Sequence, residues 1–304
     1  MDMHPFATPV ARLSALVLRM LLGLFFIVSA VAKWVDLDRF EIYVFSFQLF
    51  SLNATFLLAR LLVVGELLVG IGLLSNLCHR FVNVCTVLLL TAFTLFLGYA
   101  ILVGRTDSCQ CMGAWVDISP TLSLLKNALL FLLMIPAARC QPWGWKPRWY
   151  VWLPVLLTPF VLVFVTSAPD NWLFRPDSAT HDGNPLPFLH DDALAPLHLD
   201  SGRHAVLFVT PGCRYCRLAD QKVTAIRRRH DIDSTSIHYI ISSRPTFSSQ
   251  SFSMPVTVVS DSLFGYMTGG MTPLLMLLEN GHFVAVSHYR NIDEAQIAGF
   301  FGAK

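Results

Sequence analysis

Two cysteines with two residues between them come shortly after an apolar run in the last third of the chain. Residues 205–209 are predicted to form a strand, and Cys213 and Cys216 begin the helical pattern after it. This order places Cys213 at a helix N-terminus, where the helix dipole and free backbone N–H groups stabilise a thiolate. The neighbouring Arg214 adds a positive charge that favours the same thiolate and the reduced form. The pattern indicates thiol–disulfide chemistry, with Cys213 as the attacking thiolate and Cys216 as the resolving thiol.

Two other interpretations of this C-x-x-C motif are open. The cysteines could form a structural disulfide, or they could be half of a metal site. A metal site is disfavoured because neither a second C-x-x-C nor a pair of histidines accompanies them in the sequence. We therefore expect redox activity.

A second close pair, Cys109 and Cys111, lies between two strongly apolar segments. A disulfide between them would close a small, strained ring, and strain makes such a bond easier to reduce. An exchange site therefore suits this pair better than a structural disulfide does. Gly113 would let the backbone turn back towards the apolar segments. The alternatives are two unpaired cysteines in a loop, or a metal site.

The composition places these motifs in a membrane protein. The chain has 304 residues, of which 54% are hydrophobic and only 14% are charged. Its mean hydropathy of +0.56 is high for a soluble protein, and the charged fraction is well below the usual quarter. A net charge of +2 without a basic stripe argues against a nucleic-acid partner. Seven cysteines form neither a dense disulfide scaffold nor a zinc pattern.

Five apolar stretches in the N-terminal half each approach the roughly 20 residues that cross a bilayer. For the first, the alternative is a cleaved signal peptide, because residues 29–32 resemble a cleavage site. Arg19 interrupts that stretch and argues against a signal peptide. We expect an α-helical membrane bundle of four helices plus a fifth transmembrane helix, followed by a soluble α/β domain. The five stretches are residues 13–32, 56–74, 81–103, 122–138 and 151–168.

The distribution of Lys and Arg in short loops predicts the orientation. The segments after the second and fourth spans hold Arg80 and Arg139, whereas the other loops have mixed charge. The N-terminus is therefore expected to be cytoplasmic and the C-terminal domain periplasmic, as in a bacterial inner membrane. Both cysteine motifs would then lie on the oxidising side. Cys78 and Cys140 would lie near the inner face, and Cys85 inside the third span.

The chain is expected to have four parts. Residues 1–140 form the four-helix domain, residues 141–168 the fifth helix, residues 169–200 a proline-rich flexible tether, and residues 201–304 the α/β domain. In the last part, strands are expected at residues 203–210, 237–241, 256–259, 274–278 and 282–288, with a turn at 279–281 and helices at 213–230 and 293–301.

This α/β pattern resembles the thioredoxin-like fold over roughly residues 200–304. The resemblance rests on C-x-x-C at a strand-to-helix turn, then Thr272 and Pro273, then strand, Asn-Gly turn, strand and helix. It implies that the Thr272–Pro273 peptide is cis, a conformation that is accessible at proline. It also implies that this loop lies beside the cysteines and binds a substrate peptide. Pro211 and Gly212 depart from the aromatic residue that often precedes the first cysteine.

The N-terminal part, roughly residues 10–140, resembles the DoxX and MauE-type membrane family. Met112 stands where that family usually has Phe. The resemblance implies a four-helix bundle involved in disulfide handling, similar in plan to quinone-linked disulfide oxidases, and the whole chain resembles a fusion of such a bundle with its redox partner. The residues that carry it are Arg19, Gly23, Leu24, Phe25, Phe26, Ser29, Ala30, Lys33, Trp34, Asp36, Phe40, Glu66, Gly70, Cys109, Gln110, Cys111, Met112 and Gly113.

Ionisable residues inside membrane spans are costly and usually have a role. Counting residues along the first two spans, we expect Glu66 and Arg19 to meet near the middle of the bilayer, either as a structural ion pair or as a polar site for a quinone headgroup or a proton. Arg60 and Lys126 lie near the outer ends of their spans and could stabilise a thiolate, or their side chains could extend to the interface. Glu66 and Arg60 are thus the candidate cofactor-binding residues, and a membrane quinone is the candidate cofactor.

Together these features predict a membrane-bound thiol–disulfide oxidoreductase that exchanges disulfides with extracytoplasmic client proteins. Its C-x-x-C would be coupled to the C-x-C of the membrane domain. Two alternatives are open. One is an outward-transferring reductase fed from the cytoplasmic side through Cys78, Cys140 and Cys85. The other is a non-catalytic maturation or assembly factor related to MauE, whose cysteines only hold clients.

Overall fold

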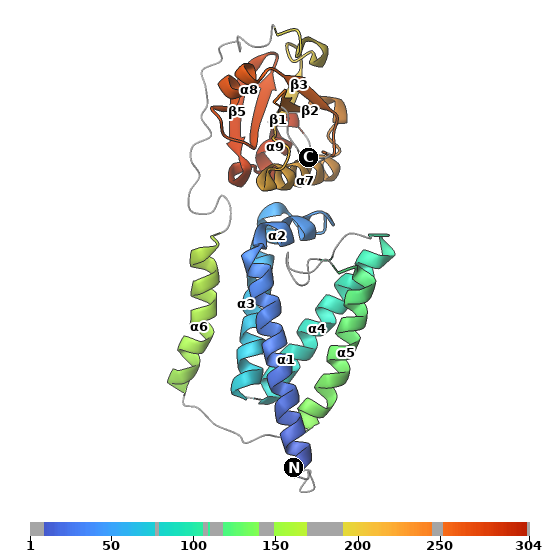
Figure 1. Ribbon diagram of the computed structural model, residues 1–304, viewed down its shortest axis with the longest axis vertical. Helices are drawn as coiled ribbons and strands as arrows, with labels where there is room; N and C mark the ends of the chain where they lie inside the picture. Colours follow the sequence, from blue (N-terminus) through green and yellow to red (C-terminus); the bar gives the residue numbers. More distant parts are fainter. Residues whose placement is uncertain are drawn as a thin grey trace. The chain divides into compact units, whose positions relative to one another are not determined.

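The computed structural model of the chain describes residues 9–76, 79–105, 109, 118–139, 149–168, 191–244 and 252–302. The chain divides into two compact units (Figure 1). The membrane unit comprises Met1–Tyr43 and Leu57–Ala168, and the C-terminal unit comprises Val44–Phe56 and Pro169–Lys304. The short segment Val44–Phe56, which the sequence analysis included in the four-helix domain, thus groups with the α/β domain.

Four helices in the N-terminal region are long and apolar enough to cross a membrane. They are α1 (Pro9–Val35), α3 (Leu52–Ser75), α4 (His79–Leu102) and α5 (Pro120–Arg139). Each overlaps one of the first four predicted spans, so the predicted four-helix membrane bundle is confirmed. Large apolar side chains also point outwards, and Leu88, Leu95 and Leu132 are 63%, 69% and 63% exposed. A helix that is apolar on all sides suits contact with lipid.

Two further helices belong to this part of the sequence, one between α1 and α3 and one after α5. The fifth predicted span corresponds to α6 (Trp149–Thr166), but its apolar part, Leu153–Thr166, is shorter than the four spans above. The fifth crossing therefore stays a prediction. The helix α2 (Leu37–Phe45) lies in a stretch that the sequence analysis assigned to an outer loop. Glu41 of α2 is buried in an ion pair with Arg60 of α3.

Two glycines bring α1 and α3 close together. A Cβ atom on Gly23 would lie 2.9 Å from the carbonyl oxygen of Gly70. A Cβ atom on Gly70 would lie 2.6 Å from the side chain of Ile27 and 2.9 Å from the carbonyl oxygen of Gly23. Any side chain at either position would push the two backbones apart. Small residues at a helix–helix contact allow this close packing in membranes.

A buried ion pair joins the same two helices. The Lys33 ammonium donates to both carboxylate oxygens of Glu66, at 2.8 and 2.9 Å, and to the Ser29 hydroxyl at 2.7 Å. Both charged side chains are almost fully buried. The predicted contact between Arg19 and Glu66 is therefore wrong. Arg19 donates instead to Asn83 of α4 at 2.9 Å. Arg19 and Lys33 are fourteen residues apart on α1, about 21 Å, so one carboxylate cannot reach both.

We expect the Lys33–Glu66 pair to be essential for the stability of the membrane unit. Removing one partner of a buried pair leaves an uncompensated charge, which costs about 3–5 kcal/mol. Glu66→Leu and Lys33→Met should each lower the thermal unfolding temperature in detergent, and the double variant should recover much of the loss. Arg39→Ala is the control, because Arg39 is 32% exposed in its contact with Asp36. Single variants as stable as this control would contradict the assignment.

The C-terminal unit contains a five-stranded mixed sheet with the strand order β3-β2-β1-β4-β5 (Figure 1). Strand β1 pairs in parallel with β2 and antiparallel with β4. The strands are β1 (Arg203–Phe208), β2 (Ile237–Ser242), β3 (Val256–Val259), β4 (Leu274–Glu279) and β5 (His282–His288). The helices are α7 (Arg214–Arg229), α8 (Asp261–Thr268) and α9 (Glu294–Phe301), and the 3-10 turns are η3 (Ala195–Leu197), η4 (Ser234–Ser236) and η5 (Tyr289–Asn291).

Turn and capping residues mark where several of these elements begin and end. Asn280 and Gly281 adopt φ angles of 52° and 76° between β4 and β5, as a tight hairpin turn requires. All five predicted strands and both predicted helices are present within a few residues of the expected bounds. Helix α8 lies outside the elements predicted from the sequence. Its N-terminus is capped by Ser260, whose hydroxyl accepts from the Leu263 amide at 3.3 Å, and it ends at Gly269 in the left-handed conformation.

The inner strands of the sheet carry a pair of histidines. His204 on β1 and His238 on β2 approach within 3.0 Å between ring nitrogens, and His204 also contacts the Ser201 carbonyl. Burial, together with the charge of His204, lowers the pKa of His238 to about 4. In the unfolded chain this histidine should titrate near its ordinary value of about 6.5.

We therefore expect the C-terminal unit to lose stability in acid. Between about pH 6.5 and 4 the unfolded state binds a proton at His238 that the folded state does not bind, so stability falls as the pH falls through this range. Amide hydrogen exchange of β1 and β2 peptides, corrected for intrinsic rates, should accelerate on acidification. His238→Asn should weaken this dependence, whereas His282→Asn, which changes an exposed histidine, should leave it intact. Equal profiles for native chain and His238→Asn would contradict the assignment.

Candidate dithiol site

Cys213 lies in the turn between β1 and α7. It is the N-cap residue of α7, with extended backbone angles, and its sulfur accepts a hydrogen bond from the Cys216 amide at 3.2 Å. Gly212, with a φ angle of 82°, makes the turn that precedes it. Backbone N–H groups at a helix N-terminus stabilise a negative sulfur. The arrangement expected from the sequence is thus present: strand, turn, cysteine, helix.

Cys216 lies one turn further along α7 and is fully buried, whereas Cys213 is partly exposed. Both cysteines are free thiols, and no disulfide joins them. Burial, with the hydrogen bond to Cys213, raises the pKa of Cys216 to about 12. Cys216 is therefore a protonated thiol at neutral pH. This difference in access and protonation fits Cys213 as the attacking sulfur and Cys216 as the resolving one.

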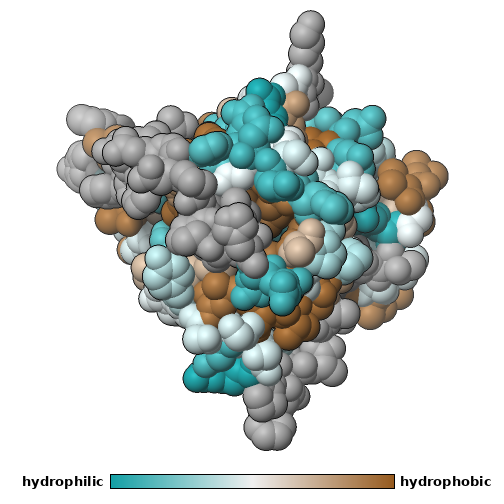
Figure 2. All heavy atoms as spheres, turned by 90° about the horizontal axis from the view of Figure 1, so that it is seen from above, coloured by the Kyte–Doolittle hydropathy of each residue, from teal (hydrophilic) through white to brown (hydrophobic). Residues whose placement is uncertain are grey.

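The loop before β4 lies next to this turn. The Thr272–Pro273 peptide is cis, so that prediction is confirmed. The hydroxyls of Thr272 and Thr210 lie 3.1 Å apart, which joins the proline loop to the turn between β1 and α7. Two large side chains in these segments are exposed, Met271 of the proline loop to 60% and Tyr215 between the two cysteines to 40%. The surface seen from above mixes hydrophilic and hydrophobic residues (Figure 2).

Asp220 is a buried carboxylate that the sequence analysis did not single out. It lies on α7 four residues after Cys216 and accepts from the Tyr239 hydroxyl at 2.9 Å and from the Ser253 amide at 3.2 Å. It thereby ties α7 to β2 and to the residues before β3. Its place on the buried face of α7 is the sequence signal that could have identified it, because a buried acidic residue needs hydrogen-bonding or charged partners.

The second motif is only partly described. The sulfur of Cys109 is buried and lies 2.8 Å from the hydroxyl of Ser123, near the start of α5, and its amide donates to the Ile118 carbonyl at 3.1 Å. Cys111 lies outside the described residues, as do Cys78 and Cys140. Cys85 packs against the apolar core of the bundle, which favours an apolar filling role.

The predicted quinone contacts already have partners in the chain. Both oxygens of Glu66 accept from Lys33. Arg60 pairs with Glu41 and donates to the carbonyls of Ser167 and Ala168 at 2.6 and 3.0 Å. The cavity beside Glu66 has a volume of about 20 Å³, which is room for about one water molecule. The described residues that line this cavity therefore do not fit a quinone ring. Lys126 lines this cavity and lies over the Phe25 ring at 5.6 Å.

We expect the two thiols of α7 to react very differently. In the native chain at pH 8, iodoacetamide should alkylate Cys213 and leave Cys216 unmodified, because Cys216 is buried and stays protonated until the pH approaches about 12. After unfolding, both should react. The light reagent is applied to the native chain for increasing times and the heavy reagent after unfolding, and peptide mapping then gives the rate of alkylation of each cysteine. Comparable native rates at the two sulfurs would contradict this assignment.

Comparison with known proteins covers both halves of the chain. Residues 11–139 match the family model described as methylamine utilisation protein MauE. Protein TlpB of Flavobacterium psychrophilum is 25% identical over 268 residues, a match that covers 70% of this chain and 72% of that protein. No solved structure matches. Residues 11–139 therefore form a MauE domain, and the chain continues from it into an α/β domain that is consistent with the thioredoxin-like fold.

Proposed function

We propose that this chain is a membrane-bound thiol–disulfide oxidoreductase in which Cys213 exchanges disulfides with proteins outside the cytoplasm. The observation that carries the proposal is the geometry of α7. A partly exposed sulfur accepts an amide hydrogen bond at the helix N-terminus, and a buried, protonated thiol lies one turn away. A structural disulfide needs no such difference between its two sulfurs. The cis-proline loop beside them, with exposed Met271, offers a surface for a client peptide.

The chemistry at α7 is a two-step exchange. The Cys213 thiolate attacks one sulfur of a disulfide, forms a mixed disulfide and releases the other sulfur as a thiolate. Cys216 then loses its proton to that thiolate and attacks the Cys213 sulfur. The products are a Cys213–Cys216 disulfide and a fully reduced partner, so two electrons leave α7. Run backwards, the same steps oxidise a dithiol client.

The partner inside the chain is the second cysteine pair, Cys109 and Cys111. Support comes from their position in the MauE domain and from the burial of the Cys109 sulfur next to Ser123. Because Cys109 is buried, we assign to Cys111 the direct exchange with Cys213 and to Cys109 the resolving role. The order is the reverse of that at α7, where the first cysteine in the sequence attacks and the second resolves. With the N-terminus in the cytoplasm and five crossings, both pairs lie on the outer side of a bacterial inner membrane.

A second candidate function follows from the family match. MauE is described as a methylamine utilisation protein, which favours a maturation factor whose cysteines hold a client without turning over. The two candidates differ in one respect. A maturation factor that only holds clients still supports its partner when Cys216 is replaced, whereas an oxidoreductase then accumulates a mixed disulfide at Cys213.

Thiol trapping in native membranes tests the relay. Samples are quenched with acid, and free thiols are tagged with a maleimide of known mass in the native chain and in Cys109→Ala/Cys111→Ala. We expect the Cys213–Cys216 pair to change redox state in the double variant, because it has lost its electron partner. The direction of the change distinguishes an oxidase from a reductase.

Cys85→Ala is the matched control for this experiment, because it removes a cysteine that packs in the apolar core of the bundle. An unchanged redox state in the double variant would refute the relay and leave only the α7 site. If Cys213→Ser then abolishes disulfide exchange with clients, the α7 site is active and receives its electrons from, or passes them to, another partner.

A further inference from the structure

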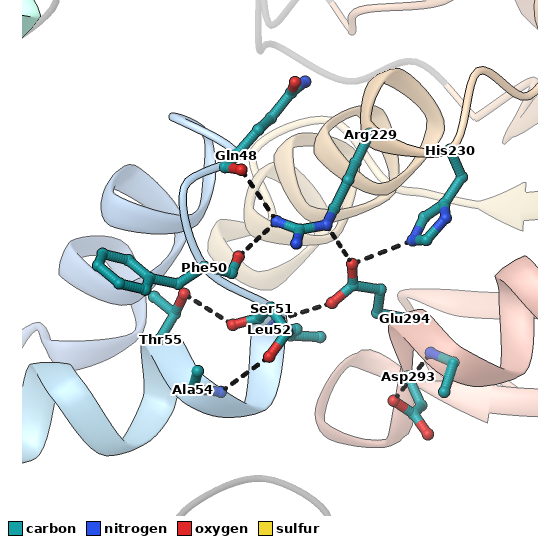
Figure 3. A network of polar contacts seen from close by, with 11 residues as sticks. Gln48, Phe50, Ser51, Leu52, Ala54, Thr55, Arg229, His230, Asp293 and Glu294 are labelled. Atoms are coloured by element: carbon teal, nitrogen blue, oxygen red, sulfur yellow. Dashed lines mark hydrogen bonds and ion pairs between the residues drawn. The ribbon is translucent and has the colours of Figure 1, made fainter. Parts of the chain in front are cut away.

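The segment Val44–Phe56 makes a set of close polar contacts with the α/β domain. Arg229, the last residue of α7, donates from Nη1 to the carbonyl oxygens of Gln48 at 3.1 Å and Phe50 at 2.6 Å (Figure 3). Both acceptors are backbone atoms of one short loop that precedes α3. A guanidinium that binds two carbonyls of a loop fixes the loop's conformation as well as its position.

Glu294, the first residue of α9, completes the contact. One carboxylate oxygen lies 2.8 Å from Arg229 Nε and 3.0 Å from His230 Nε2, and the other accepts from the Leu52 amide at 2.7 Å (Figure 3). Leu52 begins α3, so this amide is one of the N–H groups that have no acceptor within the helix. A carboxylate at this end of a helix is also favoured by the helix dipole. The α/β domain thus caps α3 with its own side chain.

An aromatic contact lies beside this network. Lys222 of α7 is fully buried, with its ammonium 5.2 Å from the ring centroids of both Phe56 and Tyr289. The ammonium also donates to the Tyr289 carbonyl at 3.3 Å. Burying a lysine is costly unless its charge is compensated, and two aromatic rings provide part of that compensation. Phe56 supplies one of the rings, so the segment helps to accommodate a charge of the α/β domain.

We propose that Val44–Phe56 is a docking site that holds the α/β domain non-covalently, in addition to the covalent link through residues 169–190. Because the chain runs from this segment into α2 on one side and α3 on the other, docking fastens the redox domain to the membrane-spanning part of the same chain. The contact uses the end of α7 that carries Arg229. Cys213 precedes the other end, about 24 Å away along a 16-residue helix. Docking and disulfide exchange therefore use different surfaces of the domain.

A cleavage experiment tests this proposal without reference to redox activity. A site for a specific protease is inserted between residues 177 and 182 of the full chain, which carries an N-terminal affinity tag and is kept in detergent. After cleavage the tag is captured, and the α/β domain that stays bound is measured. We expect the native domain to be retained. Arg229→Ala/Glu294→Gln should increase the released fraction at least about tenfold, because charged hydrogen bonds are lost.

Two further variants separate docking from misfolding. Phe56→Ala changes the segment and leaves the α/β domain unaltered, so any release that it causes reflects lost docking. Arg203→Ala is the charge-matched control, because its ion pair with Glu279 is exposed and lies on strands β1 and β4. That variant should be retained like the native chain. Release of the native domain on cleavage, to the same extent as the double variant, would overturn the proposal whatever the redox assays show.

Discussion

The chemistry attributed to this protein depends on one contact, the hydrogen bond from the Cys216 amide to the Cys213 sulfur at the N-terminus of α7. That contact exists because β1 ends in a turn through Gly212, which delivers Cys213 as the N-cap of the helix. The same helix buries Cys216 one turn later, where burial raises its pKa to about 12. A strand, a turn and a helix thus make two identical residues chemically different, and thiol exchange requires this difference.

In the membrane unit, charged groups are buried among apolar helices and must be compensated. Lys33 and Glu66 satisfy each other across the contact between α1 and α3, and the glycines of that contact allow the close approach. Cys109 is buried beside Ser123 at the start of α5. We propose that this bundle presents the second cysteine pair, and that the segment before α3 keeps the redox domain attached to it. A tethered and docked domain meets its partner at a higher effective concentration than a free protein would.

Much of the fold could be predicted because its signals are local. Apolar length predicted the four membrane helices, and the Asn280–Gly281 turn with alternating strands predicted the succession of strands along the chain but not their order in the sheet. The C-x-x-C site followed from the junction of an apolar strand with a helix. Contacts set by helix register could not be predicted, so Glu66 was paired with Arg19 instead of Lys33. The burial of Asp220 could have been predicted from its place on the apolar face of α7, but its partners could not. The roles of Arg229 and Glu294 depend on neighbours that are far away in sequence, and no local pattern marks them.

The central claim is that electrons pass directly between the two cysteine pairs of one chain. The most direct measurement removes both resolving thiols, with Cys216→Ser and Cys109→Ser in the full-length protein, adds diamide as the two-electron oxidant, and searches by mass spectrometry for a disulfide that joins the Cys213 and Cys111 peptides. The account predicts that this bond forms within single chains, independently of protein concentration, and that it is absent when Cys111 is also replaced. A chain whose Cys213 forms disulfides only with glutathione or with other proteins would contradict it.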